Sequence, residues 1–356
     1  MTGSDSTDAL AARSVLRFLT SITGRRDDAI AIVNGLFGDA LDERGSSLAT
    51  RMTIRVGKVV LPLDADDRAD RAALAEALAA ADVTASRRLC ILVHGLMSTE
   101  SIWRLPSPAP DDPPATYGTR IARDHGVTTL EVRYNTGRHI STNGRELALL
   151  LDRLLRSWPT RVREINLIGH SMGGLVVRSA CHHGRRPLGR RWWFGRRWTS
   201  KVRRVVLIGV PNTGAGLEAL VNAVSGALGS IRVPGTRLLG RGLDRRSAGI
   251  KDLRFGAILD DDWMGADPAA RDRLHPHRPL RLRRARYLVI VGTVTNDPEH
   301  PIARAIGDAL VTHASATGLS DDGELFRGAT TRVFPRVGHN RLAHHPDVED
   351  AITAWW

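Results

Sequence analysis

The sequence has little cysteine and no long hydrophobic run. Its two cysteines, Cys90 and Cys181, lie inside apolar segments without metal-ligand spacing, so we expect packed free thiols rather than a disulfide or a redox pair. No apolar stretch approaches the roughly 18 residues that a membrane span needs. The polar, acidic start from Met1 to Asp8 is unlike a secretory signal. These absences predict a cytoplasmic protein.

Cofactor motifs are also missing. No cluster of histidine, cysteine and acidic residues suggests a metal site, and no glycine-rich loop has the pattern that cradles phosphate. With 356 residues, of which 42% are hydrophobic, the chain is nevertheless long enough to bury a sizeable core. We therefore expect a globular protein whose chemistry needs neither a metal nor an organic cofactor.

Lysine is scarce, and the net charge of +13 comes almost wholly from arginine. Over the chain as a whole we attribute this excess to solvated surfaces. The stretch from Arg185 to Arg204 differs, because it holds nine basic residues and no acidic one. Four aromatic residues are interleaved with these charges: Trp192, Trp193, Phe194 and Trp198.

Two interpretations of the Arg185 to Arg204 stretch are open. Arginine pairs with lipid phosphates and tryptophan rings favour headgroup depth, so the stretch predicts a peripheral contact with an anionic membrane. Alternatively, the tryptophans pack inward and the arginines are merely solvated. We expect no nucleic-acid partner, because no recognisable nucleic-acid-binding motif accompanies the stretch.

Residues 1–85 are predicted to form an N-terminal extension in which nothing looks catalytic. Helical texture, a strand-like alternation and an alanine-rich helix follow one another there, in the ranges Leu10 to Ile22, Asp28 to Leu41, Met52 to Leu61 and Asp70 to Ala81.

From residue 86 to 356 the pattern changes to short apolar strands that alternate with helical segments. This alternation predicts an α/β fold with a mostly parallel sheet and helices on both faces. The strands are expected at Leu89 to Val93, Thr129 to Tyr134, Ile165 to Ile168, Val202 to Ile208, Tyr287 to Val291 and Thr331 to Phe334. A Gly- and Arg-rich insertion of about 78 residues, counted from 209 to 286, has the length and position of a cap or lid.

The candidate nucleophile is Ser171, in the run Gly169-His170-Ser171-Met172-Gly173-Gly174. The run follows a buried-looking strand and opens a helical segment, Leu175 to Cys181, which is the setting of a G-x-S-x-G nucleophile elbow. On such a turn the serine backbone is strained, and the flanking positions must be glycine because side chains there would collide with neighbouring backbone. A glycine-rich connection with an incidental serine is the alternative, which the flanking strand and helix disfavour.

Two backbone N–H groups are candidates for an oxyanion hole. One is that of Met172, which the dipole of the following helix reinforces, and the other is that of Leu96, because Gly95 allows a tight turn after the first strand. His94 lies in the same loop, and we interpret it as bracing the loop rather than transferring protons.

The candidate general base is His339, which follows the last strand and precedes a helix that starts near Pro346. His344 and His345 are close by but are better placed as residues flanking that helix, and His182 and His183 have no reason to reach Ser171. In proteins with this elbow the chain order is nucleophile, acid, histidine. Asp297 and Asp308 both satisfy that order, and chain geometry alone does not choose between them.

Several runs resemble the lipase and esterase branch of the α/β-hydrolases, in particular bacterial members similar to the GPI inositol-deacylase group. The runs are His94-Gly95-Leu96, Gly169 to Gly174, Val210 to Ala215, Ser247 to Gly256 and Gly307-Asp308-Ala309-Leu310-Val311. In such proteins the acid lies in a Gly-Asp-Gly-x-Val run, which favours Asp308, and the base in a Gly-His run, which favours His339. The sequence departs from the pattern at Ala309, where glycine is usual, and at Asn212, where histidine is usual.

The resemblance implies a serine hydrolase that cleaves carboxylic esters, lipid esters among them, through a Ser-His-Asp triad and an acyl-enzyme intermediate. Two alternatives stay open. An acyltransferase would use the same triad with an alcohol as acceptor, and a membrane-binding protein could retain the scaffold of a hydrolase without its activity.

Overall fold

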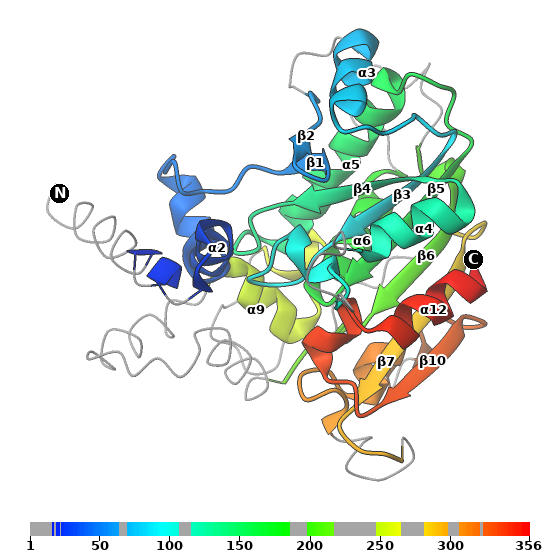
Figure 1. The fold of residues 1–356 in the computed structure, drawn as a ribbon. Coiled ribbons are helices and arrows are strands. Elements are labelled where there is room, and N and C mark those ends of the chain that lie inside the picture. The colour runs from blue at the N-terminus through cyan, green and yellow to red at the C-terminus, as the bar shows by residue number, and fades with distance from the viewer. Residues whose placement is uncertain are drawn as a thin grey trace, which may run out of the picture.

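A computed structural model describes residues 16–17, 19–21, 23–63, 70–106, 115–185, 198–216, 247–264, 281–297, 306–320 and 323–356. Figure 1 shows a central twisted sheet with helices packed against it. The helices are α2 (Arg26–Glu43), α3 (Arg71–Ala80), α4 (Tyr117–His125), α5 (Ile140–Ser157), α6 (Met172–His183), α9 (Ala248–Phe255), α11 (His313–Thr317) and α12 (Pro346–Trp355). Short 3-10 turns are η1 (Glu100–Trp103), η2 (Trp198–Lys201), η3 (Asp260–Asp262) and η4 (His339–Ala343).

The main sheet has eight strands in the order β10-β7-β6-β5-β3-β4-β1-β2. They are β1 (Thr53–Val56), β2 (Val59–Val60), β3 (Arg88–Val93), β4 (Thr128–Arg133), β5 (Glu164–His170), β6 (Val202–Ile208), β7 (Arg286–Thr293) and β10 (Thr330–Pro335), while β8 (Leu319–Ser320) and β9 (Gly323–Glu324) form a separate hairpin. The six strands from β10 to β4 pair in parallel. The predicted α/β fold is therefore confirmed, and each of the six strands expected after residue 86 is present with shifts of one or two residues at its ends.

The central strands are apolar throughout because both faces of the sheet are covered. Along β3, Leu89 and Ile91 belong to a core shared with α3, α5 and α6, whereas Cys90 and Leu92 belong to a second core shared with α4 and α12. Alternate residues of a strand point to opposite faces of the sheet. Because helices cover both faces, most positions of a central strand are buried and therefore apolar. Both cysteines are buried free thiols, as predicted.

The N-terminal region contributes to the same sheet. The alternation predicted as one strand forms a hairpin instead: β1 and β2 pair antiparallel around Gly57, whose φ of 56° suits a tight turn. Strand β1 also pairs antiparallel with β4. Helix α2 lies beside α9 (Figure 1) and contacts the loop that follows β4, where Asn135 Nδ2 donates to the carbonyl of Gly38 at 2.8 Å. The domain boundary at residue 85 stays a prediction.

The insertion predicted at 209–286 is described at 209–216, 247–264 and 281–286, of which residue 286 begins β7, and its remainder lies outside the described residues. Most of the helix predicted at Leu10 to Ile22 also falls there. In the described part of the chain, no helix has the length and apolarity that a membrane crossing requires.

Candidate active site

The turn between β5 and α6 holds Ser171 in an unusual backbone conformation. Its φ and ψ are 53° and −128°, a region that costs a non-glycine residue about 1–3 kcal/mol and persists only where the surroundings enforce it. The Ser171 N–H donates to the carbonyl of Ile208 at 2.8 Å, which ties the elbow to the end of β6. Strand β5 thus ends at His170, and Ser171 lies on the sharp turn that follows at the carboxyl edge of the sheet.

The glycines around the elbow are required by close backbone approach. A Cβ on Gly169 would lie 2.5 Å from the Cα of Gly174, and a Cβ on Gly173 would lie 2.2 Å from the carbonyl oxygen of Val93. Both distances are far below van der Waals contact, and the obstacle is backbone that cannot rotate away. The predicted steric reason for glycine at these positions is confirmed.

His339 lies between Ser171 and Asp308. Its Nε2 is 2.9 Å from Ser171 Oγ, and its Nδ1 is 2.8 Å from Asp308 Oδ2. Because an ionised carboxylate only accepts hydrogen bonds, this arrangement places the proton of the neutral imidazole on Nδ1 and leaves Nε2 to accept from the serine hydroxyl. All three side chains are buried, with relative exposures of 3%, 9% and 2% for Ser171, His339 and Asp308.

The structure places Asp308, and not Asp297, against His339. Asp308 Oδ1 accepts from the N–H groups of Leu310 and Val311 at 3.0 and 2.8 Å, so the carboxylate is held from its own loop. The His339 N–H donates to the Asp308 carbonyl at 3.0 Å. Asp297 is exposed four residues after β7 ends. One backbone hydrogen bond and one side-chain hydrogen bond therefore join the loop of Asp308 to the turn of His339.

Ala309 adopts a φ of 81°, which is the conformation that favours glycine. The left-handed region costs an L-residue with a Cβ about 1–2 kcal/mol. Alanine thus occupies, in a left-handed backbone conformation, the position at which the resembling hydrolases usually have glycine. The neighbouring Gly307, with φ 62°, admits no side chain, since a Cβ there would lie 1.8 Å from the carbonyl oxygen of Val311.

Both candidate oxyanion donors lie on segments next to Ser171. Met172 is the first residue of α6, and the first N–H groups of a helix lack partners within it. Gly95 immediately precedes Leu96, and a Cβ on Gly95 would lie 3.0 Å from Ser171 Cβ, so this loop passes against the nucleophile. The role of the Leu96 and Met172 N–H groups stays a prediction.

His94 braces the loop between β3 and η1. Its ring stacks on Tyr134 with 4.6 Å between centroids, and its Nδ1 lies 2.9 Å from the carbonyl of Gly95. Tyr134 in turn donates from its hydroxyl to the His94 carbonyl at 2.9 Å. Complete burial lowers the pKa of His94 to about 4, so the ring is neutral near pH 7.

His170 has a positioning contact that the sequence alone does not reveal. Its Nε2 donates to the carbonyl of His339 at 3.1 Å, and its ring meets Trp103 edge-on at 6.4 Å. Burial, together with the neighbouring His339, lowers the pKa of His170 well below its usual value. The position of His170 next to the nucleophile is visible in the sequence motif. Its contact with His339 is not, because the two residues are 169 positions apart and meet only in the folded chain.

Stability is expected to fall in mild acid because His94 and His170 are buried in the neutral form. Their pKa values are lowered in the folded chain, so the unfolded chain binds more protons as the pH falls below about 6.5, and each histidine removes about 1.4 kcal/mol per pH unit until its folded pKa is reached. Urea unfolding of wild type and His94→Asn between pH 6.5 and 5 measures this slope. The free energy of unfolding should fall less steeply with decreasing pH in His94→Asn than in wild type. Equal slopes for the two proteins would contradict the burial of His94 in its neutral form.

Asn212 is a structural residue of the loop after β6. Its Oδ1 accepts from Arg178 of α6 at 3.0 Å, and its Nδ2 donates to the carbonyl of Ala316 in α11 at 2.8 Å. The amide thereby joins three elements around the carboxyl edge of the sheet. Asn212 thus uses both polar atoms of its amide, Oδ1 as acceptor and Nδ2 as donor, within the structure.

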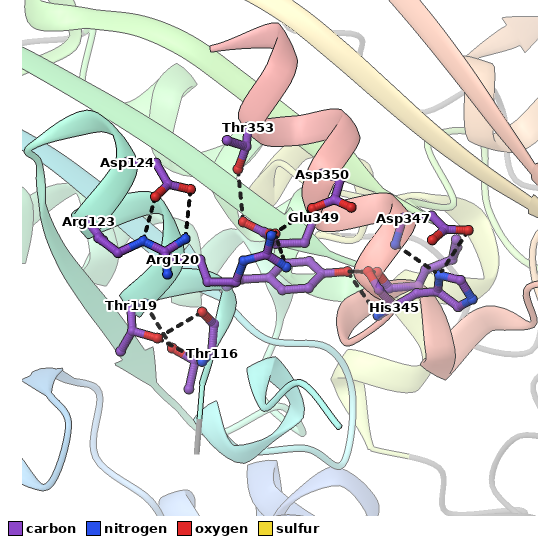
Figure 2. Close-up of polar contacts among 12 residues, drawn as sticks. Thr116, Thr119, Arg120, Arg123, Asp124, His345, Asp347, Glu349, Asp350 and Thr353 are labelled. Carbon is purple, nitrogen blue, oxygen red and sulfur yellow. Dashed lines mark hydrogen bonds and ion pairs between the residues drawn. The ribbon is translucent and has the colours of Figure 1, made fainter. Parts of the chain in front are cut away.

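Helix α4 holds the segment that carries His339. The Tyr117 hydroxyl contacts the carbonyls of Leu342 and His345 at 2.8 and 2.9 Å. Figure 2 shows Arg120 beside Glu349 and Asp350 of α12, with 2.7 Å to each carboxylate. Glu349 is fully buried, and Thr353 donates to its other oxygen at 2.8 Å.

The other histidines weighed from the sequence lie at the ends of helices or turns. His345 caps the start of α12, accepting from the Asp347 N–H, and His344 ends η4. His182 and His183 close α6, where their rings meet each other edge to face. Within the described ranges, no three histidine, cysteine or acidic side chains are grouped so as to hold a metal ion.

A nucleophile elbow at the carboxyl edge of a mostly parallel sheet, with an acid and a histidine following in chain order, defines the α/β-hydrolase class. The sequence signature of the Alpha/beta hydrolase family matches residues 90–351. The chain therefore belongs to the α/β-hydrolase family. No curated protein matches the sequence.

Solved structures with a similar fold include three bacterial enzymes. The mature lipase BlEst2 of Bacillus licheniformis is 16% identical, with 75% of this chain and 91% of that chain covered and a TM-score of 0.46. The carboxylesterase CesB of Bacillus subtilis is 13% identical over 75% and 82% of the two chains, with a TM-score of 0.40. A thermophilic esterase of Thermogutta terrifontis is 15% identical over 75% and 89%, with a TM-score of 0.42.

Proposed function

We propose that this α/β-hydrolase cleaves carboxylic esters, with Ser171 as nucleophile, His339 as general base and Asp308 as the acid that orients the imidazole. The observation that carries the proposal is the buried, hydrogen-bonded line from Ser171 Oγ through both nitrogens of His339 to Asp308 Oδ2. Nucleophile and base lie within hydrogen-bond reach, and a third group holds the base, as activation of a serine requires.

In the proposed reaction, His339 Nε2 takes the hydroxyl proton while Ser171 Oγ attacks the carbonyl carbon of the ester. The carbonyl oxygen becomes an oxyanion, to which the N–H groups of Met172 and Leu96 would donate. When the tetrahedral species collapses, the C–O bond to the alcohol breaks and His339 returns the proton to the departing oxygen. Water, deprotonated by His339, then attacks the acyl-enzyme and releases the carboxylic acid and free Ser171.

Asp308 contributes by orientation and charge. Its carboxylate keeps the Nδ1 proton of His339 in place, so Nε2 faces the serine, and it stabilises the imidazolium that forms during attack.

Lipid esters are the substrate class that the resemblance to lipases and inositol deacylases favours, and this finer specificity stays a prediction. The experiment is a series of p-nitrophenyl esters of rising acyl length, run with and without an alcohol acceptor. We expect turnover that depends on acyl length and yields mainly the free acid. Transfer of the acyl group to the alcohol as the main reaction would indicate an acyltransferase, and no turnover by the folded protein would contradict the proposed activity.

A further inference from the structure

Basic residues gather at the edge of the sheet opposite Ser171. Strands β3, β5, β6 and β7 are parallel neighbours, so their first residues share one edge, which we call the amino edge. In register, Arg88 pairs with Glu164 of β5, and Arg204 pairs with Arg286. Adjacent strands lie about 4.8 Å apart, so arginines at these strand starts form one row across the sheet.

The connections that enter these strands extend the row into a wider surface. Arg161 and Arg163, just before β5, are exposed. Arg281, Arg283 and Arg284, just before β7, are exposed as well. The eight arginines named so far are defined here as the amino-edge surface: Arg88, Arg161, Arg163, Arg204, Arg281, Arg283, Arg284 and Arg286. Their strands are distant in sequence, so this clustering arises only from the strand order.

Acidic residues do not balance this surface. Among the described starts of β3 to β7 and the connections leading into them, the acidic residues are Asp82, Asp124 and Glu164. Glu164 is paired with Arg204 at 2.6 Å, and Asp124 with Arg123 at 2.6 Å. The amino-edge surface therefore keeps a strong positive excess.

Two tryptophans from the end of α12 lie among these arginines. The guanidinium of Arg286 is 4.6 Å from the ring centre of Trp355, and that of Arg204 is 5.3 Å from Trp356. Trp356 also stacks on His125 at 5.0 Å. These rings are engaged by the protein's own side chains, so they are poorly suited to serve as stacking platforms for the bases of a single-stranded nucleic acid.

We propose that the amino-edge surface docks the protein on an anionic lipid bilayer. Arginine pairs with lipid phosphates, and each basic residue near such a surface contributes about 1 kcal/mol of attraction. The charge is spread over the starts of β3, β6 and β7 and over two connections, which matches a broad anionic plane better than the single track of a polynucleotide.

This surface differs from the one expected from sequence. Residues 186–197 of the Arg185 to Arg204 stretch lie outside the described residues, and Trp198 is only 1% exposed, with its ring packed over Gly184. For Trp198 the inward-packing interpretation is therefore the correct one. The docking proposal rests instead on arginines contributed by several connections.

Docking at the amino edge leaves the site of Ser171 free. Strand β5 has seven residues, so about 20 Å separate its start at Glu164 from its end at His170. The bilayer would tether the protein while Ser171 faces away from it. The docking proposal does not depend on the proposed ester chemistry.

The test compares binding of three proteins to vesicles of phosphatidylcholine with phosphatidylglycerol and to vesicles of phosphatidylcholine alone. The first is wild type, and the second carries Arg161→Gln, Arg163→Gln, Arg283→Gln and Arg284→Gln. The matched control removes the same charge from exposed positions around α2: Arg25→Gln, Arg26→Gln, Arg44→Gln and Arg51→Gln. Circular dichroism and thermal unfolding verify that all three are folded.

We expect wild type and the α2 control to sediment with the anionic vesicles, and the amino-edge variant, which lacks four arginines, to bind them about a thousandfold more weakly. Binding should also weaken as salt rises, because exposed charges are screened over roughly 8 Å at physiological ionic strength. Equal binding by both quadruple variants would overturn the proposal. So would failure of wild type to bind anionic vesicles, including the case in which it binds only single-stranded DNA.

Discussion

Replacing Ser171 with alanine is expected to lower kcat/KM for a short-chain ester by a thousandfold or more while the protein stays folded. The reason is chemical, since alanine has no oxygen to form the acyl-enzyme, and residual catalysis would come only from binding and the oxyanion donors. His339→Ala should cause a comparable loss because the hydroxyl at 2.9 Å from Nε2 would then have no base. Steady-state kinetics with purified proteins measures both.

The control for these variants is stability. Ser171 has a φ of 53°, and removing its hydroxyl leaves that backbone unchanged, so thermal unfolding should move little. Because residues of one triad act as a unit, the double variant should be scarcely slower than either single variant. Turnover like that of wild type by a folded Ser171→Ala protein would remove the triad assignment.

Asp308→Asn is expected to reduce kcat by a thousandfold or more, whereas Asp297→Asn should leave it nearly unchanged. An amide at 2.8 Å from His339 Nδ1 can donate its own N–H, which favours the wrong tautomer and turns the protonated nitrogen toward Ser171. Asp297 is exposed and serves as the matched control, since it carries the same substitution in the loop after the same strand.

The comparison is decided by kcat measured at the pH optimum of wild type, with substrate binding followed separately through KM. A merely structural Asp308 would give a protein with altered stability and nearly normal kcat per folded molecule. If Asp297→Asn is the crippled variant, the assignment of the acid is wrong.

Much of the fold was predictable because burial of a parallel sheet on both faces produces short, continuously apolar segments in the sequence. Strands β3, β5, β6 and β7 are short apolar runs, and a strand between two helical layers has no solvent-facing side to mark with polar residues. The elbow was predictable for a different reason. Its glycines are demanded by contacts with nearby backbone, so the local sequence carries the geometry.

Relations between distant segments were not predictable in the same way. Nothing in the spacing of Asp297 and Asp308 separates them, because the choice depends on which loop folds back over the turn of His339. The contact of His170 with the His339 carbonyl has the same origin. Likewise, the single alternation from Met52 to Leu61 did not show that it would break at Gly57 and join β4.

The amino-edge surface illustrates the limit most clearly. The charge that is contiguous along the chain, from Arg185 to Arg204, is visible in the sequence. Arg88, Arg204 and Arg286 are not visible there as one group, since they come to the same edge only through the order β3-β5-β6-β7. Local patterns therefore predicted elements and motifs, whereas the strand order was needed to find this surface.

The most direct test of the central claim is covalent labelling by a fluorophosphonate, followed by mass spectrometry of the labelled peptide. The reagent reacts with a serine only when a base activates it, so it reports the Ser171–His339 pair without any assumption about the natural ester. The account predicts a single adduct on Ser171 in wild type, none in Ser171→Ala and strongly slowed labelling in His339→Ala. An unlabelled Ser171 in the folded wild type, or an adduct on another residue, would contradict it.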